Sequence, residues 1–252
     1  MGRRISVVVP AYNEEGNIAY VVSEIQGLKK KTGWDIEIVV ADDNSKDGTG
    51  RILDNLSANC PYLKVIHRSD GRNGIGAALI DGTRHATGDI IVWLMGDRSD
   101  NPLDLIGMVN KLDEGYDLVC GSRFIKKGSV HNYPFVKLIS NRLFNNLLRL
   151  MFLMGVRDIT NAFKVFRRDM LGTIQPLSCK DFDITIELPL KAKLEGLRIS
   201  EAPVTWQGRV SGISNLRLGK MASKYLSTSL RIWVETLRRA LSGKHGKHKQ
   251  AV

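Results

Sequence analysis

Two polar segments near the start of the chain each follow a run of β-branched residues. The segment 10–14 (Pro-Ala-Tyr-Asn-Glu) comes directly after residues 5–9, and the pair Asp42-Asp43 comes directly after residues 36–41. Such runs, closed by turn-forming polar residues, are typical of buried parallel strands. In an open parallel sheet, ligands bind beyond the carboxyl ends of the strands. Carboxylates accept hydrogen bonds from base N–H groups and ribose hydroxyls, so these two segments could bind a nucleotide.

A third polar segment, Leu-Met-Gly-Asp-Arg-Ser-Asp-Asn-Pro, occupies residues 94–102 at the end of another apolar run. Carboxylate oxygens are the ligands that Mg²⁺ and Mn²⁺ prefer. Asp97 and Asp100 are the carboxylates of this segment.

The pattern that must position these residues is an alternation of strands and helices. Strands are predicted at residues 5–9, 36–41, 63–67, 89–94 and 117–120, with helices at 17–31, 49–59, 74–86 and 102–112. This order predicts an α/β fold with a doubly wound, mostly parallel sheet and helices on both faces. After residue 123 the pattern changes to a helix at 133–154, a polar turn and strand at 158–168, a helix at 183–196 and a strand at 197–205.

Charge is concentrated at the C-terminal end. The 252 residues carry a net charge of +11, of which +8 falls in residues 217–252. Residues 218–241 have the spacing of a basic amphipathic helix, which could lie in a lipid interface or pack on the body of the protein. A nucleic-acid partner is disfavoured because no stacking aromatic residues are interleaved with the basic ones.

Other features limit the classes of protein. The three cysteines, Cys60, Cys120 and Cys179, are far apart and odd in number, which indicates reduced thiols in a cytosolic protein. The first predicted strand begins too early to leave room for a signal peptide. Because no apolar run approaches 18 residues, we expect a chain that does not cross a bilayer by itself.

Taken in order, these segments resemble the family-2, A-type (GT-A) inverting glycosyltransferases. The likeness continues through residues 71–78 and 86–89 to the metal loop at 94–102. Further on it narrows to the polyprenyl-phosphate branch of that family, which includes the dolichol-phosphate mannose synthases. The segments that carry this narrower likeness are Gly121-Ser122-Arg123, Ser140 with Asn145, and residues 158–167, 182–187 and 207–215.

The resemblance implies roles for named residues. The implied donor-binding residues are Pro10, Tyr12, Glu14, Asp42, Asp43, Gly76 and Asp97. The implied metal ligands, for Mg²⁺ or Mn²⁺, are Asp97 and Asp100. The implied acceptor-phosphate residues are Arg123, Ser140, Arg142, Arg167, Arg209 and Ser214. Of all these, Asp97, Arg123 and Arg209 are the implied catalytic residues.

The chain departs from the family pattern at four positions. Met95 stands where the family has the first aspartate of its metal loop, and a thioether cannot replace a hard oxygen ligand. Asn141 and Lys164 stand where arginine is common, and Asn215 stands where lysine is common. Each of these three changes is expected to weaken one phosphate contact.

The function that follows is transfer of a hexose, with inversion, from a nucleotide-sugar to a polyprenyl or dolichyl phosphate. Mannose from GDP-mannose is the family default. A lipid phosphate is already anionic near neutral pH, so it needs cations more than a general base. We expect a cytoplasmic protein held peripherally at the cytosolic membrane face, by residues 218–241 and 133–154 or by a membrane partner subunit. The implied organisation is a nucleotide-sugar-binding half (1–123), an acceptor-binding half (124–216) and a basic helix with its tail (217–252).

Three alternatives stay open. The donor could be UDP-glucose or UDP-N-acetylglucosamine. The acceptor could be a hydroxyl instead of a lipid phosphate, which would require a general base, with Asp183 or Glu187 as the candidate. The chain could also bind sugar nucleotides without turnover, an idea that Met95 encourages.

Overall fold

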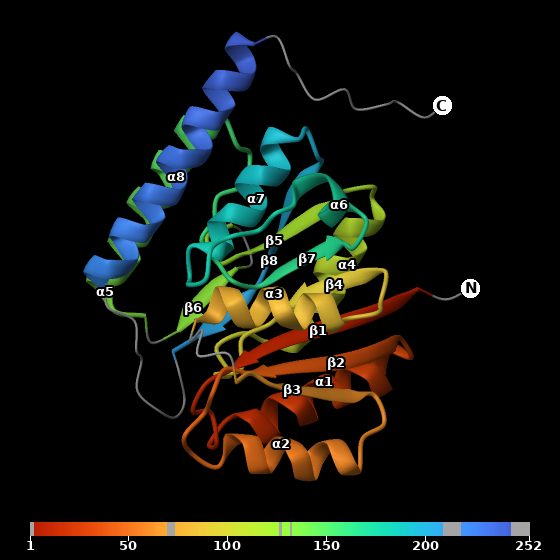
Figure 1. Cartoon of the computed structure of the whole chain (residues 1–252). Coiled ribbons are helices and arrows are strands. Elements are labelled where there is room, and N and C mark those ends of the chain that lie inside the picture. The colour runs from red at the N-terminus through yellow and green to blue at the C-terminus, as the bar shows by residue number, and fades with distance from the viewer. Residues whose placement is uncertain (1–2, 70–73, 126–127, 132, 209–217, 243–252) are drawn as a thin grey trace.

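The computed structural model describes residues 3–69, 74–125, 128–131, 133–208 and 218–242. Its centre is a seven-stranded sheet in the order β3-β2-β1-β4-β7-β5-β8 (Figure 1). The strands are β1 (Arg4–Ala11), β2 (Asp35–Asp42), β3 (Leu63–His67), β4 (Ile90–Trp93), β5 (Leu118–Ser122), β7 (Lys164–Arg167) and β8 (Ile199–Pro203). Every neighbouring pair is parallel except those of β7, which runs antiparallel to both β4 and β5.

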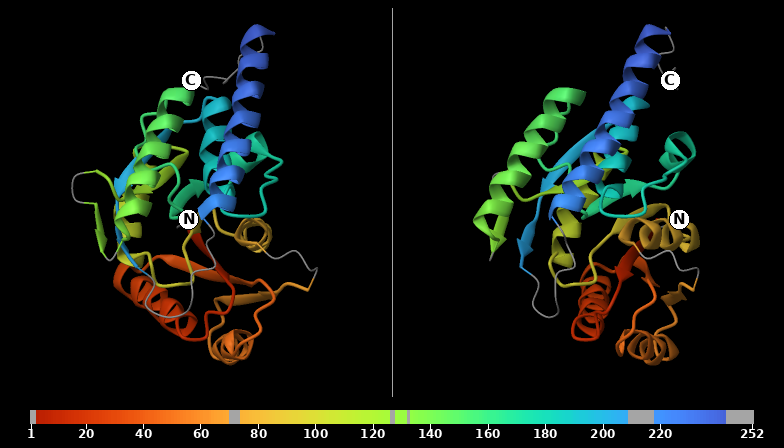
Figure 2. Two further views of the ribbon diagram at one scale, coloured as in Figure 1. Left: turned by 90° about the vertical axis from the view of Figure 1, so that its left-hand side faces the viewer. Right: turned by 60° about the vertical axis from the view of Figure 1, so that its left-hand side comes forward.

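The central strands are apolar on both sides because helices cover both faces of the sheet. Val7 and Val9 of β1 face one layer, which contains α1 (Ile18–Thr32), α2 (Thr49–Ala58) and α4 (Leu105–Asp113). Val8 faces the other layer, which contains α3 (Ile75–His85), α5 (Phe135–Phe152), α6 (Met170–Ile174), α7 (Ile184–Leu194) and α8 (Leu218–Leu241) (Figures 1 and 2). This arrangement confirms the predicted doubly wound α/β fold and the predicted C-terminal helix.

The predicted elements of the first half lie where the structure has β1 to β5 and α1 to α4, within a few residues at each end. Three features were not predicted, and one of them is the short helix α6. The segment after Asn101 begins as a single 3₁₀ turn, η1 (Pro102–Asp104), before α4 starts. A separate parallel pair joins β6 (Ser129–His131) to β9 (Thr205–Gln207).

The reversed direction of β7 positions the second half of the chain. Lys164, at its start, pairs with Trp93 at the end of β4, and Arg167, at its end, pairs with Ile90 at the beginning of β4. Residues 158–163 therefore lie at the edge where the parallel strands β1, β2 and β4 end. The nucleotide-sugar-binding half (1–123) and the acceptor-binding half (124–216) therefore contribute strands to the same sheet.

A buried carboxylate fixes the segment before α7 to the two helices beside it. Glu187 is fully buried and accepts hydrogen bonds from the backbone N–H groups of Ser178 (2.9 Å) and Cys179 (2.8 Å). Lys191 of α7 and Arg231 of α8 pair with its other oxygen at 3.0 and 3.2 Å. Burial alone would raise the pKa of Glu187, but the two N–H groups and Lys191 together lower it to about 2.

No helix of the described residues has both the length and the hydrophobicity that crossing a bilayer requires.

The pKa of Glu187 predicts how stability depends on pH. Against an ordinary value of 4.5, a pKa near 2 means that the ionised form stabilises the fold above about pH 4.5. This contribution is lost as the pH falls toward 2. We expect Glu187→Gln to lower the free energy of unfolding by about 3 kcal/mol at neutral pH, because it leaves two cations near a neutral group. The difference from wild type should shrink below about pH 4.5, as measured by urea unfolding in steps down to about pH 3.

The matched control is Glu235→Gln, which removes a partly exposed carboxylate paired with Arg239 on α8. Exposed pairs contribute little, so this variant should unfold like wild type. A Glu187→Gln deficit that stays constant across the pH range would contradict the account.

Candidate functional site

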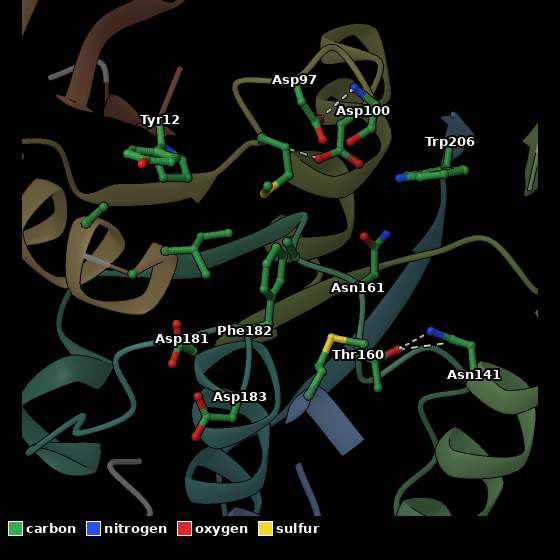
Figure 3. A pocket seen from close by; sticks show the side chains of 18 of the residues that line it. Tyr12, Asp97, Asp100, Asn141, Thr160, Asn161, Asp181, Phe182, Asp183 and Trp206 are labelled. Atoms are coloured by element: carbon green, nitrogen blue, oxygen red, sulfur yellow. Dashed lines mark hydrogen bonds between the residues drawn. The ribbon is translucent and has the colours of Figure 1, made fainter. Parts of the chain in front are cut away.

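A cavity of about 780 Å³ lies at the edge of the sheet where β1, β2 and β4 end. This size is in the range of pockets that hold a nucleotide or a similar ligand. Side chains from both halves of the chain enclose it, as Figure 3 shows. Residues at the ends of β1, β2, β4 and β5 form one part of the wall. The first two turns of α5 and α8 form another part. Residues 160–162 and 181–183, together with Trp206 of β9, complete it.

The wall beside β1 and β2 carries residues suited to a base and ribose. Pro10, Tyr12, Glu14 and Asp43 all line the cavity. Tyr12 leaves 37% of its surface exposed, and this ring could stack on a base. The side chain of Glu14 accepts from Asn17 Nδ2 at 2.7 Å.

Asp43 is held by a buried cation, Arg68, whose role was not predicted from the sequence. Arg68, which follows β3, donates to Asp43 Oδ1, and its Nε donates to Asp81 at 2.7 Å. The N–H of Gly74, just before α3, donates to the other oxygen of Asp43. Only the position of Arg68 after a strand could have indicated this role. The arrangement fixes the Asp43 carboxylate in the cavity wall, ready to accept from a ligand N–H or hydroxyl.

Two predicted donor-binding residues lie outside the cavity wall. The buried Asp42 points toward β3, where its Oδ2 lies 2.9 Å from His67 Nδ1 and its Oδ1 accepts from Ser45 N at 3.1 Å. Hydrogen bonds to Asp42 and Asp54 raise the pKa of His67. A Cβ at Gly76 would collide with the carbonyl oxygen of Cys179, so this glycine permits close packing of α3. Neither Asp42 nor Gly76 lines the cavity, and the contacts of both lie within the fold.

The loop after β4 brings two carboxylates into the cavity. Asp97 accepts from Ser99 N at 3.1 Å, and the buried Asp100 accepts from Met95 N at 3.3 Å. The second oxygen of Asp100 has no hydrogen-bond partner among the described residues. Burial and the charge of Asp97 raise the pKa of Asp100 to about 7. The donor set fits a hard divalent cation, because it offers carboxylate oxygens and one of them is unsatisfied.

This candidate metal centre is small. Within the described part of the chain, no group of three or more His, Cys, Asp or Glu side chains converges on one point. Two carboxylates with ligand phosphates and water are the arrangement that Mg²⁺ usually takes in proteins.

The cavity wall also carries cations. Arg123, which follows β5, is buried and donates through Nε and Nη2 to both oxygens of Asp158 at 2.7 and 2.8 Å. Burial would lower the pKa of Arg123, but the charge and hydrogen bonds of Asp158 raise it above its usual range. Lys137, in the first turn of α5, also lines the cavity, and its Nζ lies 5.6 Å from the ring centre of Tyr133. Together, Arg123 and Lys137 could bind an anionic group.

Three other predicted acceptor residues, Ser140, Arg142 and Arg167, do not line the cavity. Arg167 is at the far edge of the sheet, where it donates to the carbonyls of Tyr116 and Leu112, so its assignment was wrong. Ser140 is exposed and donates to Val136 O at 2.9 Å, and the exposed Arg142 stacks against Phe124. Arg209 and Ser214 lie outside the described residues.

Two residues that depart from the family pattern, Lys164 and Asn141, have different positions in the structure. Lys164 is fully buried, and its Nζ donates to the carbonyls of Ile159 (3.0 Å) and Asn161 (2.6 Å). It therefore shapes the loop that lines the cavity and does not face a ligand. Asn141 does line the cavity, where its Nδ2 donates to the hydroxyl of Thr160 at 3.1 Å. Asn215 lies outside the described residues.

The two candidate general bases, Glu187 and Asp183, lie in different surroundings. Glu187 is enclosed by its partners, lies outside the cavity wall and has a lowered pKa, so it is unsuited to remove a proton. Asp183 lines the cavity on the side away from Asp97 (Figure 3). Its Oδ2 accepts from the Thr228 hydroxyl at 2.9 Å, while its buried Oδ1 has no hydrogen-bond partner among the described residues.

Comparisons with solved structures support the fold. Glucosyl-3-phosphoglycerate synthase from Mycobacterium tuberculosis, in complex with Mn²⁺, UDP-glucose and phosphoglyceric acid, superposes with a TM-score of 0.69 at 23% identity. The match covers 92% of this chain and 80% of that chain. Its complex with Mn²⁺, UDP and glucosyl-3-phosphoglycerate gives a TM-score of 0.67 at 23% identity, over 92% of this chain and 81% of that chain.

Sequence relatives are more similar. The chain is 30% identical over 220 residues to a polyprenol monophosphomannose synthase of Mycolicibacterium smegmatis, covering 85% of this chain and 81% of the relative. It is 32% identical over 225 residues to a dolichol-phosphate mannosyltransferase of Pyrococcus furiosus, covering 88% of this chain but only 62% of that relative. Residues 6–174 match the sequence model of glycosyl transferase family 2. The chain belongs to glycosyl transferase family 2, with the GT-A fold.

Proposed function

We propose that this protein transfers mannose, with inversion, from GDP-mannose to a polyprenyl phosphate at a membrane surface. The proposal is supported mainly by one cavity whose wall carries both carboxylates and cations. Asp97 and Asp100 suit a metal-bound diphosphate, and Arg123 with Lys137 suits the phosphate of an acceptor. The names of the two sequence relatives supply mannose as the sugar and a polyprenol or dolichol phosphate as the acceptor. GDP as the nucleotide rests on the family resemblance.

The proposed reaction requires that the donor and the acceptor be positioned correctly, and it requires no general base. In the proposed reaction an oxygen of the acceptor phosphate forms a bond to the anomeric carbon, while the bond from that carbon to the diphosphate breaks. The electron pair leaves with the diphosphate, and no proton must be removed, because a phosphate monoester is largely dianionic near neutral pH. Attack from the face opposite the leaving group inverts the anomeric centre.

Different residues of this chain would bind the nucleoside and the acceptor phosphate. Tyr12 and Asp43 orient the nucleoside, and Arg123 with Lys137 holds the acceptor phosphate in line. Asp97 would hold a divalent cation, which would supply neutralisation of the charge on the leaving diphosphate.

An exposed apolar band supports a lipid acceptor. One face each of α5 and α8 exposes large apolar side chains, and the two helices contact each other through the stacked rings of Phe144 and Tyr225. The band consists of Phe135, Val136, Ile139, Leu143, Leu147 and Leu150 on α5, and Leu226, Leu230, Val234, Leu237 and Leu241 on α8. Exposed apolar surface of this extent marks an interaction site.

The band is connected to the cavity. The first turns of α5 and α8 contribute Lys137, Asn141, Met221 and Lys224 to the cavity wall. A phosphate bound there would carry its hydrocarbon chain toward the apolar band. The opposite face of α8 packs on the body through Tyr225 and Ile232, so this helix can bind lipid without leaving the fold. We therefore propose peripheral attachment to the cytosolic face of a membrane, without requiring a partner subunit.

A second candidate function is transfer to a hydroxyl acceptor. The observation that favours it is Asp183, whose unpartnered oxygen belongs to a residue of the cavity wall. Such a carboxylate could remove a proton from a hydroxyl.

The direct test is a matrix of donors and acceptors. GDP-mannose, UDP-glucose and UDP-N-acetylglucosamine are each supplied with polyprenyl phosphate or with free sugars and glycerol, in Mg²⁺ or Mn²⁺. We expect labelled lipid from GDP-mannose and polyprenyl phosphate, unchanged in Asp183→Asn. Transfer only to hydroxyl compounds, lost in Asp183→Asn, would establish the second candidate instead. Nucleotide binding without any transfer would reject both.

Arg123 offers a test of the acceptor side. Arg123→Lys keeps the positive charge but loses the planar fork, so we expect kcat/KM for polyprenyl phosphate to fall by about ten- to hundredfold, the value of a charge-assisted hydrogen bond. GDP binding by calorimetry should stay near wild type, which also shows that the fold survives. The matched control is Arg167→Lys at the far edge of the sheet, with activity within about twofold of wild type. Equal losses in the two variants would remove Arg123 from the acceptor site.

The apolar band predicts lipid binding. The double variant Leu143→Glu/Leu230→Glu places a charge on each helix of the band, and we expect it to lose most co-sedimentation with anionic vesicles while keeping GDP binding. Ala58→Glu, on the exposed face of α2, adds charge away from the band and should pellet like wild type. Equal pelleting of all three proteins would show that another surface contacts the membrane.

A further inference from the structure

A second cavity, of about 250 Å³, lies beside the C-terminal end of α3. It is lined by residues of α3 and α6, by residue 168 after β7 and by residues 175–177 after α6. Among the residues that the structure describes, none lines both this cavity and the one at the ends of β1, β2 and β4, which is called the first cavity below. The second cavity is therefore a separate place where a ligand could bind.

One wall of the second cavity carries a guanidinium group with an unused donor. Arg168 directly follows β7, and its Nε donates to the carbonyl oxygen of Gly88 at 2.6 Å. Its Nη2 is buried and has no hydrogen-bond partner among the described residues. Buried polar atoms are nearly always paired, so this N–H group lacks an acceptor that a ligand could supply.

A second guanidinium group lines the cavity from α3. The side chain of Arg84 is 69% exposed, and its Nη1 donates to Asp81 at 3.1 Å. Asp81 also accepts from the buried Arg68 at 2.7 Å, so its charge is shared between two arginines. The described residues that line the second cavity include no acidic one. The cavity is therefore positively charged, and it suits an anion.

The neutral residues of the wall indicate what kind of molecule would carry the anionic group. The hydroxyl of Thr83 accepts from Trp93 Nε1 at 2.9 Å, so its own hydrogen can be donated to a ligand. Ile80, Leu171 and Leu177 add apolar surface. A volume of about 250 Å³ is below the range of pockets that hold drug-sized ligands, so the molecule must be small.

We propose that the second cavity binds a small organic phosphate. The planar guanidinium groups of Arg84 and Arg168 would bind its oxygens, and the Thr83 hydroxyl would donate to another of them. A tetrahedral phosphate presents oxygens in several directions, which suits donors that come from different elements of the wall. The apolar residues would contact the organic part. This inference does not depend on the proposed function, because the residues assigned to the transfer reaction line the first cavity.

Two tryptophans allow the two cavities to be observed separately, by ¹⁵N NMR of the indole N–H groups. Trp93 donates to Thr83 in the wall of the second cavity, whereas Trp206 lines the first cavity. The chain has four tryptophans, so Trp34→Phe, Trp206→Phe and Trp233→Phe assign all four resonances. Phenyl phosphate is the probe, because it joins a phosphate to a small apolar ring. We expect it to shift the Trp93 resonance in a saturable way.

Variants of the two arginines test which residues bind the probe. We expect the apparent Kd of phenyl phosphate, measured at Trp93, to rise at least about tenfold in Arg168→Gln and at least about threefold in Arg84→Gln, whose arginine is more exposed. The matched control is Arg157→Gln, which removes an exposed arginine paired with Glu201 and should leave the Kd within about twofold of wild type. Thermal unfolding near wild type would show that each variant is folded.

Several outcomes would overturn the inference. One is a Trp93 resonance that stays in place while that of Trp206 moves, because the probe would then bind only in the first cavity. Another is an unchanged Kd in both Arg168→Gln and Arg84→Gln, or an equal loss in Arg157→Gln. Benzoate has the same ring with a carboxylate, and equally tight binding of benzoate would overturn the assignment of a phosphate. None of these results bears on the transfer reaction, which the assay of donors and acceptors tests separately.

Discussion

One strand running against its neighbours brings the two sides of the site together. In a sheet where β1, β2 and β4 all end at the same edge, the insertion of β7 in the opposite direction delivers residues 158–163 to that edge. Asp158 then reaches Arg123 at the end of β5, and Thr160 with Asn161 completes the cavity wall. A parallel β7 would have put these residues on the far side, where Arg167 now lies. The position of the cavity therefore follows from the order and direction of the strands in the sheet.

The second constraint is that charges buried around the cavity must be paired. Arg68 neutralises Asp43 on the nucleotide side, and Asp158 neutralises Arg123 on the acceptor side. Lys164 is satisfied by two carbonyls of the 159–161 loop. Each pair costs desolvation free energy, but it leaves the side chain that faces the ligand rigid and ionised. Against this pattern the unpartnered oxygens of Asp100 and Asp183 stand out as the places where a ligand would complete the set.

The sequence predicted the strands, the helices and their order because apolar runs and turn residues report on burial directly. Tyr12, Asp43 and Asp97, which it predicted to bind the donor, all line the cavity, since each follows a strand whose end could be recognised. It could not distinguish Asp42 from Asp43, because adjacent residues at a strand end point in opposite directions. Arg167 was misassigned for a related reason: the direction of a short strand leaves no trace in its composition. Arg68 and Lys137 were missed because partners in space are far apart in the chain.

We propose that one cavity receives a metal-bound sugar nucleotide at Asp97 and an anionic acceptor at Arg123. A crystal structure of the protein with GDP and Mn²⁺ tests it most directly. The account predicts the base against Tyr12 and Asp43, and the Mn²⁺ ion bridging the diphosphate to the carboxylate of Asp97. Arg123 should remain paired with Asp158 and face an open space beside the diphosphate. A nucleotide bound outside this cavity, or a diphosphate seated on Arg123 and Lys137 with no metal at Asp97, would contradict it.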